Sequence, residues 1–510
     1  MKTIRLSLQD PNLDEGHRVG LAGLHRTLKK PSRRTLDLLK DKDIQYSCDN
    51  LGVTFTCPDK MNELNFVHIM VNILYFIEDG LLKLGAYGDD RGNEYVSKEV
   101  AVHEALLYGP IGASRVKKLG SFRKYSLSDN PEDEKELKYK SIKSLNILKI
   151  QDLKKKQVKR KEEFTYSLNS SISPGRASAN GPNGYIKETL VQFLCSLSFY
   201  AGCYIYKPFY EKGGSRPTRT SGTPDAILIA PVPTDLDKLY QRWMPYFEGF
   251  QPKNIRNSEE AILQVQVALE KRRLEHQRLK DCICGLICYQ CKKSSWNPNV
   301  SEIQNIRYEN DITDEVINTY RLCRDVYVPR LQQRKDGTRF MKYPKMPSFA
   351  AQNMLNGRDW FCGLHNFSAQ ELKWDILICG EEKTAMDEKL TPEAQILVKG
   401  IRKSWANHMA HIFESYKGFD QDRKIEKAKD VHLRTCQRLY GHRFVNWVLD
   451  FLTKYRTSAS AEAASVVSEY IEKPSTKDVI RLKSLFTFAI CSYKGTGNQD
   501  QLQEKKQDSE

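Results

Sequence analysis

The sequence predicts an α+β protein in which a mixed α/β N-terminal body with long basic loops is followed by a C-terminal α-helical bundle. Three observations support this fold class. Short strand-like and helical patterns alternate over the first part of the chain, glycine-bearing basic loops interrupt them, and the pattern from Thr391 onward is almost wholly helical. A chain of 510 residues is expected to hold several domains. The expected regions are an α/β region at 1–130, a basic helical insertion at 131–169, the continuation of the α/β body at 170–390, the helical bundle at 391–493 and a flexible tail at 494–510.

The N-terminal body opens with a strand and a helix. Thr3–Leu8 alternates apolar and polar residues, and the small and aliphatic residues that follow predict a helix that Pro31 ends. Ile44–Cys57 predicts two short strands around a turn. Asp59–Gly80 predicts an amphipathic helix closed by glycine.

Helices and strands continue to alternate through the rest of the body. A helix that ends near Gly357 precedes Trp360 and Phe361, two aromatic residues that we expect to be exposed. The other expected elements are helices at Tyr185–Tyr200, Asn257–Lys280 and Val316–Asp325, and strands at Gly202–Tyr206 and Ala226–Val232.

The C-terminal bundle begins at a clear helix start. Thr391 supplies an N-cap, Pro392 fits the first helical turn, and Glu393 favours the helix dipole. About four helices follow, separated near Gly418, at Gly441 and near Pro474.

Composition and charge exclude several classes of protein. Hydrophobic residues make up 40% of the chain, enough for packed cores, so wholesale disorder and collagen-like structure are excluded. No apolar run reaches the roughly 18–20 residues that span a bilayer, and the N-terminus has no signal-peptide core. Thirteen scattered cysteines favour a reducing compartment. We therefore expect a soluble, cytoplasmic protein whose net charge of +16 favours an anionic partner.

A basic block lies at Lys138–Lys161, where ten basic residues accompany one acid. A solvated surface helix would explain this block. A compact set of cations is also typical of a phosphate-binding segment. The candidate DNA-binding residues here are Lys154, Lys155, Lys156, Lys159 and Arg160.

Two long glycine-bearing loops, at residues 170–184 and 211–225, enter and leave the same predicted core. Long loops inside compact domains are more often functional than not, although surface insertions would look similar. Arginine and asparagine can read base edges, and glycine lets the backbone approach a groove closely. The candidate DNA-binding residues of the two loops are Arg176, Asn180, Asn183, Arg216 and Arg219.

Catalytic signatures are weak. The sequence has no phosphate-binding G-x-x-x-x-G-K-[ST] loop and no His-Asp dipeptide. Asp225 before a strand resembles the start of a restriction-type nuclease motif, but the expected following strands, with Asp235–Lys238 and Glu270–Arg272, lack the acid-x-lysine spacing that completes a metal site. We expect no catalytic residues and no enzyme activity. A metal-dependent nuclease and a basic RNA- or DNA-packaging protein are the alternatives.

Two groups of residues could bind metal. Cys282, Cys284, Cys288 and Cys291 could supply four thiolates to a structural zinc, but their short spacing and apolar neighbours favour core packing. His408 and His411 lie one helical turn apart, with Glu414 following, and such sets are usually surface polar residues. No cofactor is expected, and a structural zinc remains the open alternative.

Four passages, taken in order along the chain, carry a family resemblance. They are residues 17–24 after the opening strand, 173–206 with the sequence P-G-R-A leading into an apolar helix, 353–364 with the sequence N-M-L-N-G-R-D-W-F, and 475–495. Together they resemble the large subunit of type I CRISPR effector complexes (Cascade), in its MYXAN-subtype branch. The basic His25-Arg26 pair, the block at Lys138–Lys161 and the cysteine cluster depart from that pattern.

The resemblance implies a non-catalytic subunit whose N-terminal part reads the protospacer-adjacent motif and whose helical bundle lines the path of the displaced strand. It implies as partners the guide RNA, the other Cascade subunits, the target duplex with its displaced strand, and a recruited helicase-nuclease or transposition adaptor.

Overall fold

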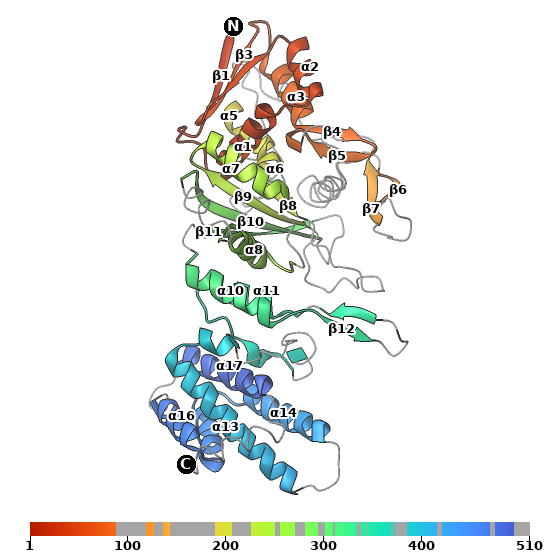
Figure 1. Cartoon of the computed structure of the whole chain (residues 1–510). Helices are drawn as coiled ribbons and strands as arrows, with labels where there is room; N and C mark the ends of the chain where they lie inside the picture. The colour runs from red at the N-terminus through yellow and green to blue at the C-terminus, as the bar shows by residue number, and fades with distance from the viewer. Residues whose placement is uncertain are drawn as a thin grey trace, which may run out of the picture. The chain divides into compact units, whose positions relative to one another are not determined.

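The computed structural model has an α+β fold, as predicted, with small antiparallel sheets and a C-terminal run of helices (Figure 1). The described residues up to Ile312 form one compact unit, and those from Thr313 form a second. The structure describes residues 1–87, 119–126, 136–142, 189–206, 226–249, 255–270, 281–293, 301–309, 312–333, 337, 339–342, 344–368, 371–372, 385–415, 421–469 and 475–493.

The first unit contains a three-stranded antiparallel sheet of order β1-β3-β2. Ile4 and Leu6 of β1 and Val53 and Phe55 of β3 point inward, as the alternating pattern predicted. Three described helices and two hairpins belong to the same part of the unit, and the second hairpin contacts β5 of the first. The elements are β1 (Lys2–Ser7), α1 (Glu15–Lys29), α2 (Arg33–Asp41), β2 (Gln45–Cys48), β3 (Gly52–Cys57), α3 (Glu63–Leu74), β4 (Tyr75–Glu78), β5 (Leu81–Leu84), β6 (Leu119–Ser126) and β7 (Glu136–Ile142).

A four-stranded antiparallel sheet of order β11-β10-β9-β8 completes the first unit. Helix α1 contacts β3 of the first sheet and β9 of the second, so it forms the centre of the unit. The elements are α5 (Leu190–Leu197), α6 (Phe199–Gly202), β8 (Tyr204–Tyr206), β9 (Ala226–Pro233), α7 (Leu236–Gly249), α8 (Ser258–Glu270), β10 (Ile283–Lys293) and β11 (Ser301–Glu309).

Glycines let α1 approach α5 and α6 closely. A Cβ added to Gly20 would lie 1.7 Å from the carbonyl oxygen of Cys195, and one added to Gly23 would lie 2.3 Å from the backbone nitrogen of Gly202. Gly202 in turn faces the carbonyl of Val19. The backbones therefore touch directly, and no side chain larger than hydrogen fits between them. Two of the passages that carry the resemblance thus contact each other across this interface.

Several predicted elements of the first unit are confirmed, and others differ. The opening strand, the strand pair around residues 49–52 and the strand at β9 are present. The helix expected over Asp59–Gly80 is wrong at its C-terminal end, because α3 stops at Leu74 and Tyr75–Glu78 pairs with β5. Asp79 and Gly80 both have positive φ, as a two-residue hairpin turn requires.

Two further differences concern charged segments. Residues 136–142 form strand β7, although 131–169 was expected to be a helical insertion; the rest of that range lies outside the described residues. Asp235–Lys238 starts helix α7 and Glu270 ends helix α8, so neither lies on the strand expected for a nuclease motif.

The second unit consists of a short α/β segment followed by five described bundle helices. Thr391 caps α13 through its hydroxyl, as predicted, and an additional break near Tyr455 separates α15 from α16. The elements are α10 (Asp314–Val326), β12 (Arg330–Gln333), β13 (Arg339–Lys342), α11 (Met346–Leu355), α13 (Pro392–Ser415), α14 (Gln421–Arg438), α15 (Gly441–Lys454), α16 (Ser458–Glu469) and α17 (Thr476–Ser492).

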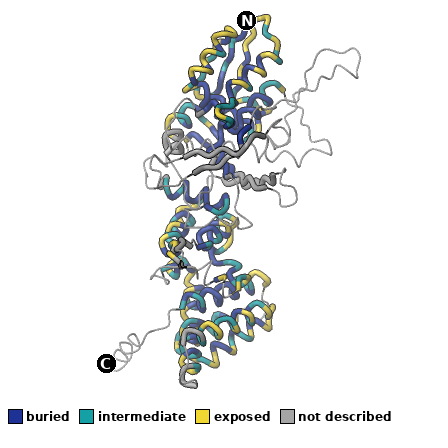
Figure 2. Tube along the Cα trace, turned by 90° about the vertical axis from the view of Figure 1, so that its right-hand side faces the viewer, coloured by how far each residue is buried: buried dark blue, intermediate teal, exposed yellow. Residues whose placement is uncertain are grey.

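One hydrophobic core runs through the second unit, and exposed residues lie on the outer faces of its helices (Figure 2). Trp360 and Phe361 were expected to be exposed, but both are buried, at 3% and 2% exposure. The indole of Trp360 packs edge-on against Phe488 of α17, and its Nε1 donates to the carbonyl of Lys389. The residues after α11 therefore complete the core of the bundle.

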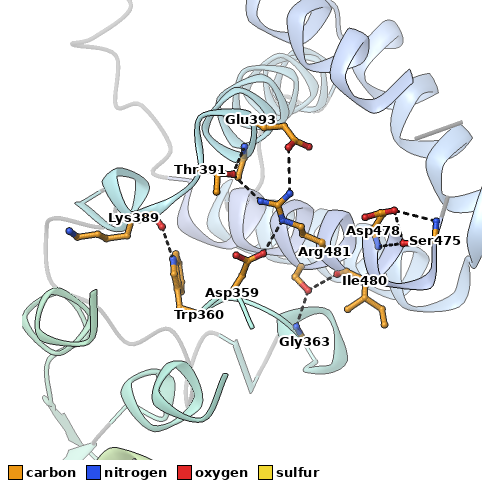
Figure 3. Close-up of polar contacts among 12 residues, drawn as sticks. Asp359, Trp360, Gly363, Lys389, Thr391, Glu393, Ser475, Asp478, Ile480 and Arg481 are labelled. Carbon is orange, nitrogen blue, oxygen red and sulfur yellow. Dashed lines mark hydrogen bonds and ion pairs between the residues drawn. The ribbon is translucent and has the colours of Figure 1, made fainter. Parts of the chain in front are cut away.

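Arg481 of α17 connects that segment to the start of α13 (Figure 3). Its Nε donates to Asp359 at 2.9 Å, and its Nη2 donates to the hydroxyl of Thr391 at 2.9 Å. Glu393 lies 3.6 Å from its Nη1. The other two passages that carry the resemblance, around 353–364 and 475–495, are thus joined to each other.

Within the described part of the chain, no helix has an apolar run long enough to cross a bilayer.

Candidate nucleic-acid interface

The predicted DNA-binding residues of the basic block and the two loops lie outside the described residues. The structure does describe the elements that flank the two loops. The loop at 211–225 lies between β8 and β9, which are paired, with Tyr206 opposite Ile227. The loop at 170–184 precedes α5, which packs on α1. The residues concerned are Lys154, Lys155, Lys156, Lys159, Arg160, Arg176, Asn180, Asn183, Arg216 and Arg219.

The four clustered cysteines lie on or beside one extended strand, β10. Cys282 and Cys288 are buried, and the Cys288 thiol lies 3.7 Å from the carbonyl of Ser258 on α8. Burial raises the pKa of Cys282 to about 11. A strand rises about 3.3 Å per residue, so the backbone of this cluster extends over about 30 Å. The structure therefore does not gather the four residues around a common point.

The histidines proposed as a weak metal pair lie in an aromatic cluster. The ring of His408 lies 4.9 Å from that of His432 on α14 and 4.5 Å from that of Tyr455, the residue that follows α15. His411 lies beside Tyr455, and the side chain of Glu414 lies outside the described residues. Among the side chains that the structure describes, no three potential ligands converge as a metal site would require.

One aromatic residue of the second unit, Tyr440, is strongly exposed. Tyr440, in the turn between α14 and α15, is 74% exposed, more than any other large apolar or aromatic side chain in the described ranges. Arg438, His442 and Arg443 are exposed on either side of it. Gly441 has φ 52°, and a Cβ there would meet no atom within 4 Å, so this side of the turn faces open space.

The Tyr440 ring makes a cation–π contact with a buried lysine. Lys483 of α17 is 3% exposed, and its Nζ lies 4.5 Å from the Tyr440 ring centroid and 5.4 Å from that of Phe444. The same Nζ donates to the carbonyl of Gln437 at 3.4 Å. Burial lowers the pKa of Lys483. The cation thus contacts the ring by a cation–π interaction, while most of the Tyr440 side chain stays exposed.

Helix α14 carries a row of cations that leads to this turn. Lys427, Arg434 and Arg438 are exposed, and Val431 lies between them at 54% exposure. Their spacing of four, three and four residues places them on one helix face about 16 Å long. Arg434 is paired with Asp430 at 2.8 Å. We call Lys427, Arg434 and Arg438 the α14 basic stripe.

The sequence alone does not single out Tyr440. The one available signal is the segment Arg438–Arg443, R-L-Y-G-H-R, in which a helix-breaking glycine follows an aromatic residue among cations. Exposure separates this tyrosine from the many buried aromatic residues of the bundle, and exposure becomes visible only in the folded chain.

The contact between His408 of α13 and His432 of α14 predicts that the bundle loses stability in acid. Burial, then the charges of His432, Lys454 and His411, lower the pKa of His408 to about 4. Burial also lowers the pKa of His432. Above pH 6.5, the pKa of a histidine in the unfolded chain, neither the folded nor the unfolded state binds a proton at His408. As the pH falls from 6.5 toward 4, the unfolded chain binds it and the folded chain does not, which removes about 1–2 kcal/mol after allowing for partial exposure.

Urea denaturation at pH 7 and pH 5 measures this loss. His408→Phe keeps an aromatic ring in the cluster and is expected to reduce the difference between the two pH values. Exposed His442→Gln is the control and should leave that difference as in the parent protein. An equal pH effect in the parent protein and in His408→Phe would show that this residue does not cause it.

Comparison with known families adds one match. Residues 5–197 match the family model described as the DevT N-terminal domain. The matched region runs from β1 to the end of α5, so it includes α1 and its close contact with α5. A comparison with curated proteins finds no match. Over this region, less than half of its length, the chain is similar to the DevT N-terminal domain.

Proposed function

We propose that this chain is the non-catalytic, DNA-recognising large subunit of a guide-RNA-directed Cascade complex. DevT is a CRISPR-associated protein of the Cascade type, and the N-terminal match supports membership of such a complex. The four ordered passages and the net charge of +16 agree with this proposal. In this role the chain recognises the protospacer-adjacent motif, supports unwinding of the target and recruits a helicase-nuclease or a transposition adaptor.

The observation that carries the proposal is the exposed Tyr440 beside the α14 basic stripe. Proteins that bind single strands combine a positively charged track for phosphates with aromatic rings on which bases stack. Tyr440 supplies the ring, and Lys427 and Arg438 supply charge on the adjoining helix face. In addition, α15 begins directly after Tyr440, and the positive end of its helix dipole favours a phosphate there.

In guided recognition, different parts of the complex recognise different parts of the target. Base pairing with the guide reads the long target sequence, so the protein needs only a short duplex motif and a grip on the displaced strand. We assign motif reading to the loops at 170–184 and 211–225, through the arginines and asparagines predicted there. We assign the displaced strand to the surface formed by Tyr440 and the α14 basic stripe.

Replacing Tyr440 by alanine is expected to weaken single-strand binding by the assembled complex about 5- to 150-fold, because stacking contributes about 1–3 kcal/mol per base. Tyr440→Phe keeps the ring and should bind nearly as the parent does. The slope of the logarithm of the binding constant against the logarithm of the salt concentration (the salt slope) changes by about 0.7 for each phosphate contact with a single strand. Replacing both Arg438 and Arg443 by glutamine should therefore reduce the salt slope by about 1.4.

The measurement is fluorescence anisotropy of a labelled strand over a series of salt concentrations. Exposed Arg456→Gln, in the turn after α15, is the control for a general change in charge. If the parent complex and the Tyr440→Ala complex bind the single strand with equal affinity, this surface does not contact the displaced strand.

A further inference from the structure

A second exposed tip of the second unit has residue types suited to nucleic acid. Asn356, Gly357 and Arg358 follow α11 in sequence, and all three are exposed. Gly357 has φ 68°, and a Cβ at this position would meet no atom within 4 Å. The tip therefore faces open space, and its glycine permits close approach of a ligand to the backbone.

Hydrogen bonds hold the backbone of this tip in one conformation. The N–H of Gly357 donates to the carbonyl of Met354 at 3.0 Å, and that of Arg358 donates to the carbonyl of Asn353 at 2.9 Å. The side-chain Nδ2 of Asn353 donates to the carbonyls of Trp360 and Cys362, at 3.1 and 2.8 Å. One buried amide thus fixes both ends of the turn.

The far side of the turn is attached to α17 (Figure 3). Asp359 pairs with Arg481, Trp360 packs on Phe488, and the N–H of Gly363 donates to the hydroxyl of Ser484 at 2.9 Å. A group displayed by this turn is therefore held by the core of the bundle. Rigid display lowers the entropy cost of binding.

Arg358 is the displayed group. Its side chain is exposed and makes no hydrogen bond or ion pair within the described part of the chain. The nearest acid in sequence, Asp359, is already paired with Arg481. Asn353, Asp359 and Trp360 each have an internal partner, whereas the guanidinium of Arg358 has no hydrogen-bond or ion-pair partner among the residues that the structure describes. An unpaired cation on a rigid tip fits an anionic ligand from outside the chain.

We infer that Arg358 binds a phosphate of the target DNA in the assembled complex, an inference that rests on the proposed function. A nucleic acid is favoured over a protein carboxylate because the chain carries a net charge of +16, which suits a polyanion, and because the same unit carries the exposed Tyr440 and the α14 basic stripe. Phosphate binding fixes position without reading sequence, so the contact is the same for any target.

Arg358→Ala tests this inference in the complete complex with guide RNA and target DNA. Loss of one phosphate contact is expected to lower affinity about fivefold at 0.15 M salt and the salt slope by about 0.7–0.9. Arg358→Lys should restore most of the slope, and Arg456→Ala should behave as the parent. Thermal denaturation of each variant checks that the fold is unchanged.

The outcomes separate the inference from the proposed function. If the parent complex binds no target DNA, the proposed function fails. If the parent binds but Arg358→Ala has the same affinity and slope, the inference alone fails. It also fails if Arg358→Ala weakens binding only for certain flanking sequences, which would indicate base reading, or if the variant prevents assembly with the other subunits, which would indicate a protein carboxylate as the partner.

Discussion

Replacing Gly20 by alanine is expected to destabilise the N-terminal unit by about 3 kcal/mol or more. The new Cβ would lie 1.7 Å from the carbonyl oxygen of Cys195, an atom of the α5 backbone that moves only if the two helices separate. Gly23→Ala meets the backbone of α6 in the same way, with the Cβ 2.3 Å from the nitrogen of Gly202. Because α1 also contacts both sheets, its displacement would disrupt the whole unit.

Gly16→Ala is the matched control for this prediction. It makes the same change in the same helix, but the nearest atom to its Cβ is a side-chain oxygen of Asp14 at 3.4 Å, an ordinary contact. Alanine favours a helix over glycine, so this variant should be about as stable as the parent or up to about 1 kcal/mol more stable. Urea denaturation followed by circular dichroism compares the variants. A midpoint for Gly20→Ala equal to that of Gly16→Ala would mean that α1 does not pack on α5 as described.

Replacing Trp405 by alanine is expected to cost about 3–5 kcal/mol in the second unit. The indole is fully buried, and its ring lies 5.0 Å from that of His432 and 5.5 Å from that of His408, in the cluster where α13, α14 and α15 meet. No neighbouring side chain can fill the space, because Phe451 and Tyr455 already pack against the same histidines.

Thermal denaturation of Trp405→Ala beside Tyr440→Ala measures the difference between a buried and an exposed aromatic residue of the same bundle. Tyr440→Ala should stay within about 0.5 kcal/mol of the parent, as surface substitutions usually do. A loss of less than about 1 kcal/mol for Trp405→Ala would contradict the position of this residue in the core.

Local signals predicted much of the fold correctly. The hydroxyl N-cap that the sequence indicated at Thr391 is present, and the alternating residues of β1 and the apolar run of β9 indicated strands. The hairpin β4–β5 was missed because the apolar run of α3 continues into Tyr75–Ile77. Only the Asp79-Gly80 turn marks the change, and a glycine at that place also fits the end of a helix.

Tertiary contacts explain the other differences. Trp360 and Phe361 follow a glycine in a polar segment, which suggested exposure, but α17 covers them. For Cys282 and Cys288 the apolar neighbours favoured core packing over zinc, and both side chains are buried. Tyr440 and Arg358 were not predicted as binding residues. Tyr440 is distinguished by its exposure and Arg358 by the contrast with its partnered neighbours, and both features exist only after folding.

The most direct test of the central claim is the affinity of the chain for duplex DNA that carries a guide-matched target. It is measured first for the chain alone and then with guide RNA and the other complex subunits, at fixed salt and with randomised flanking bases. The proposed function predicts tight binding only in the assembled complex, with selection of a few flanking base pairs and no cleavage by this chain. Tight binding or cleavage by the chain alone, indifferent to guide and flanking sequence, would contradict it and favour a nuclease or a packaging protein.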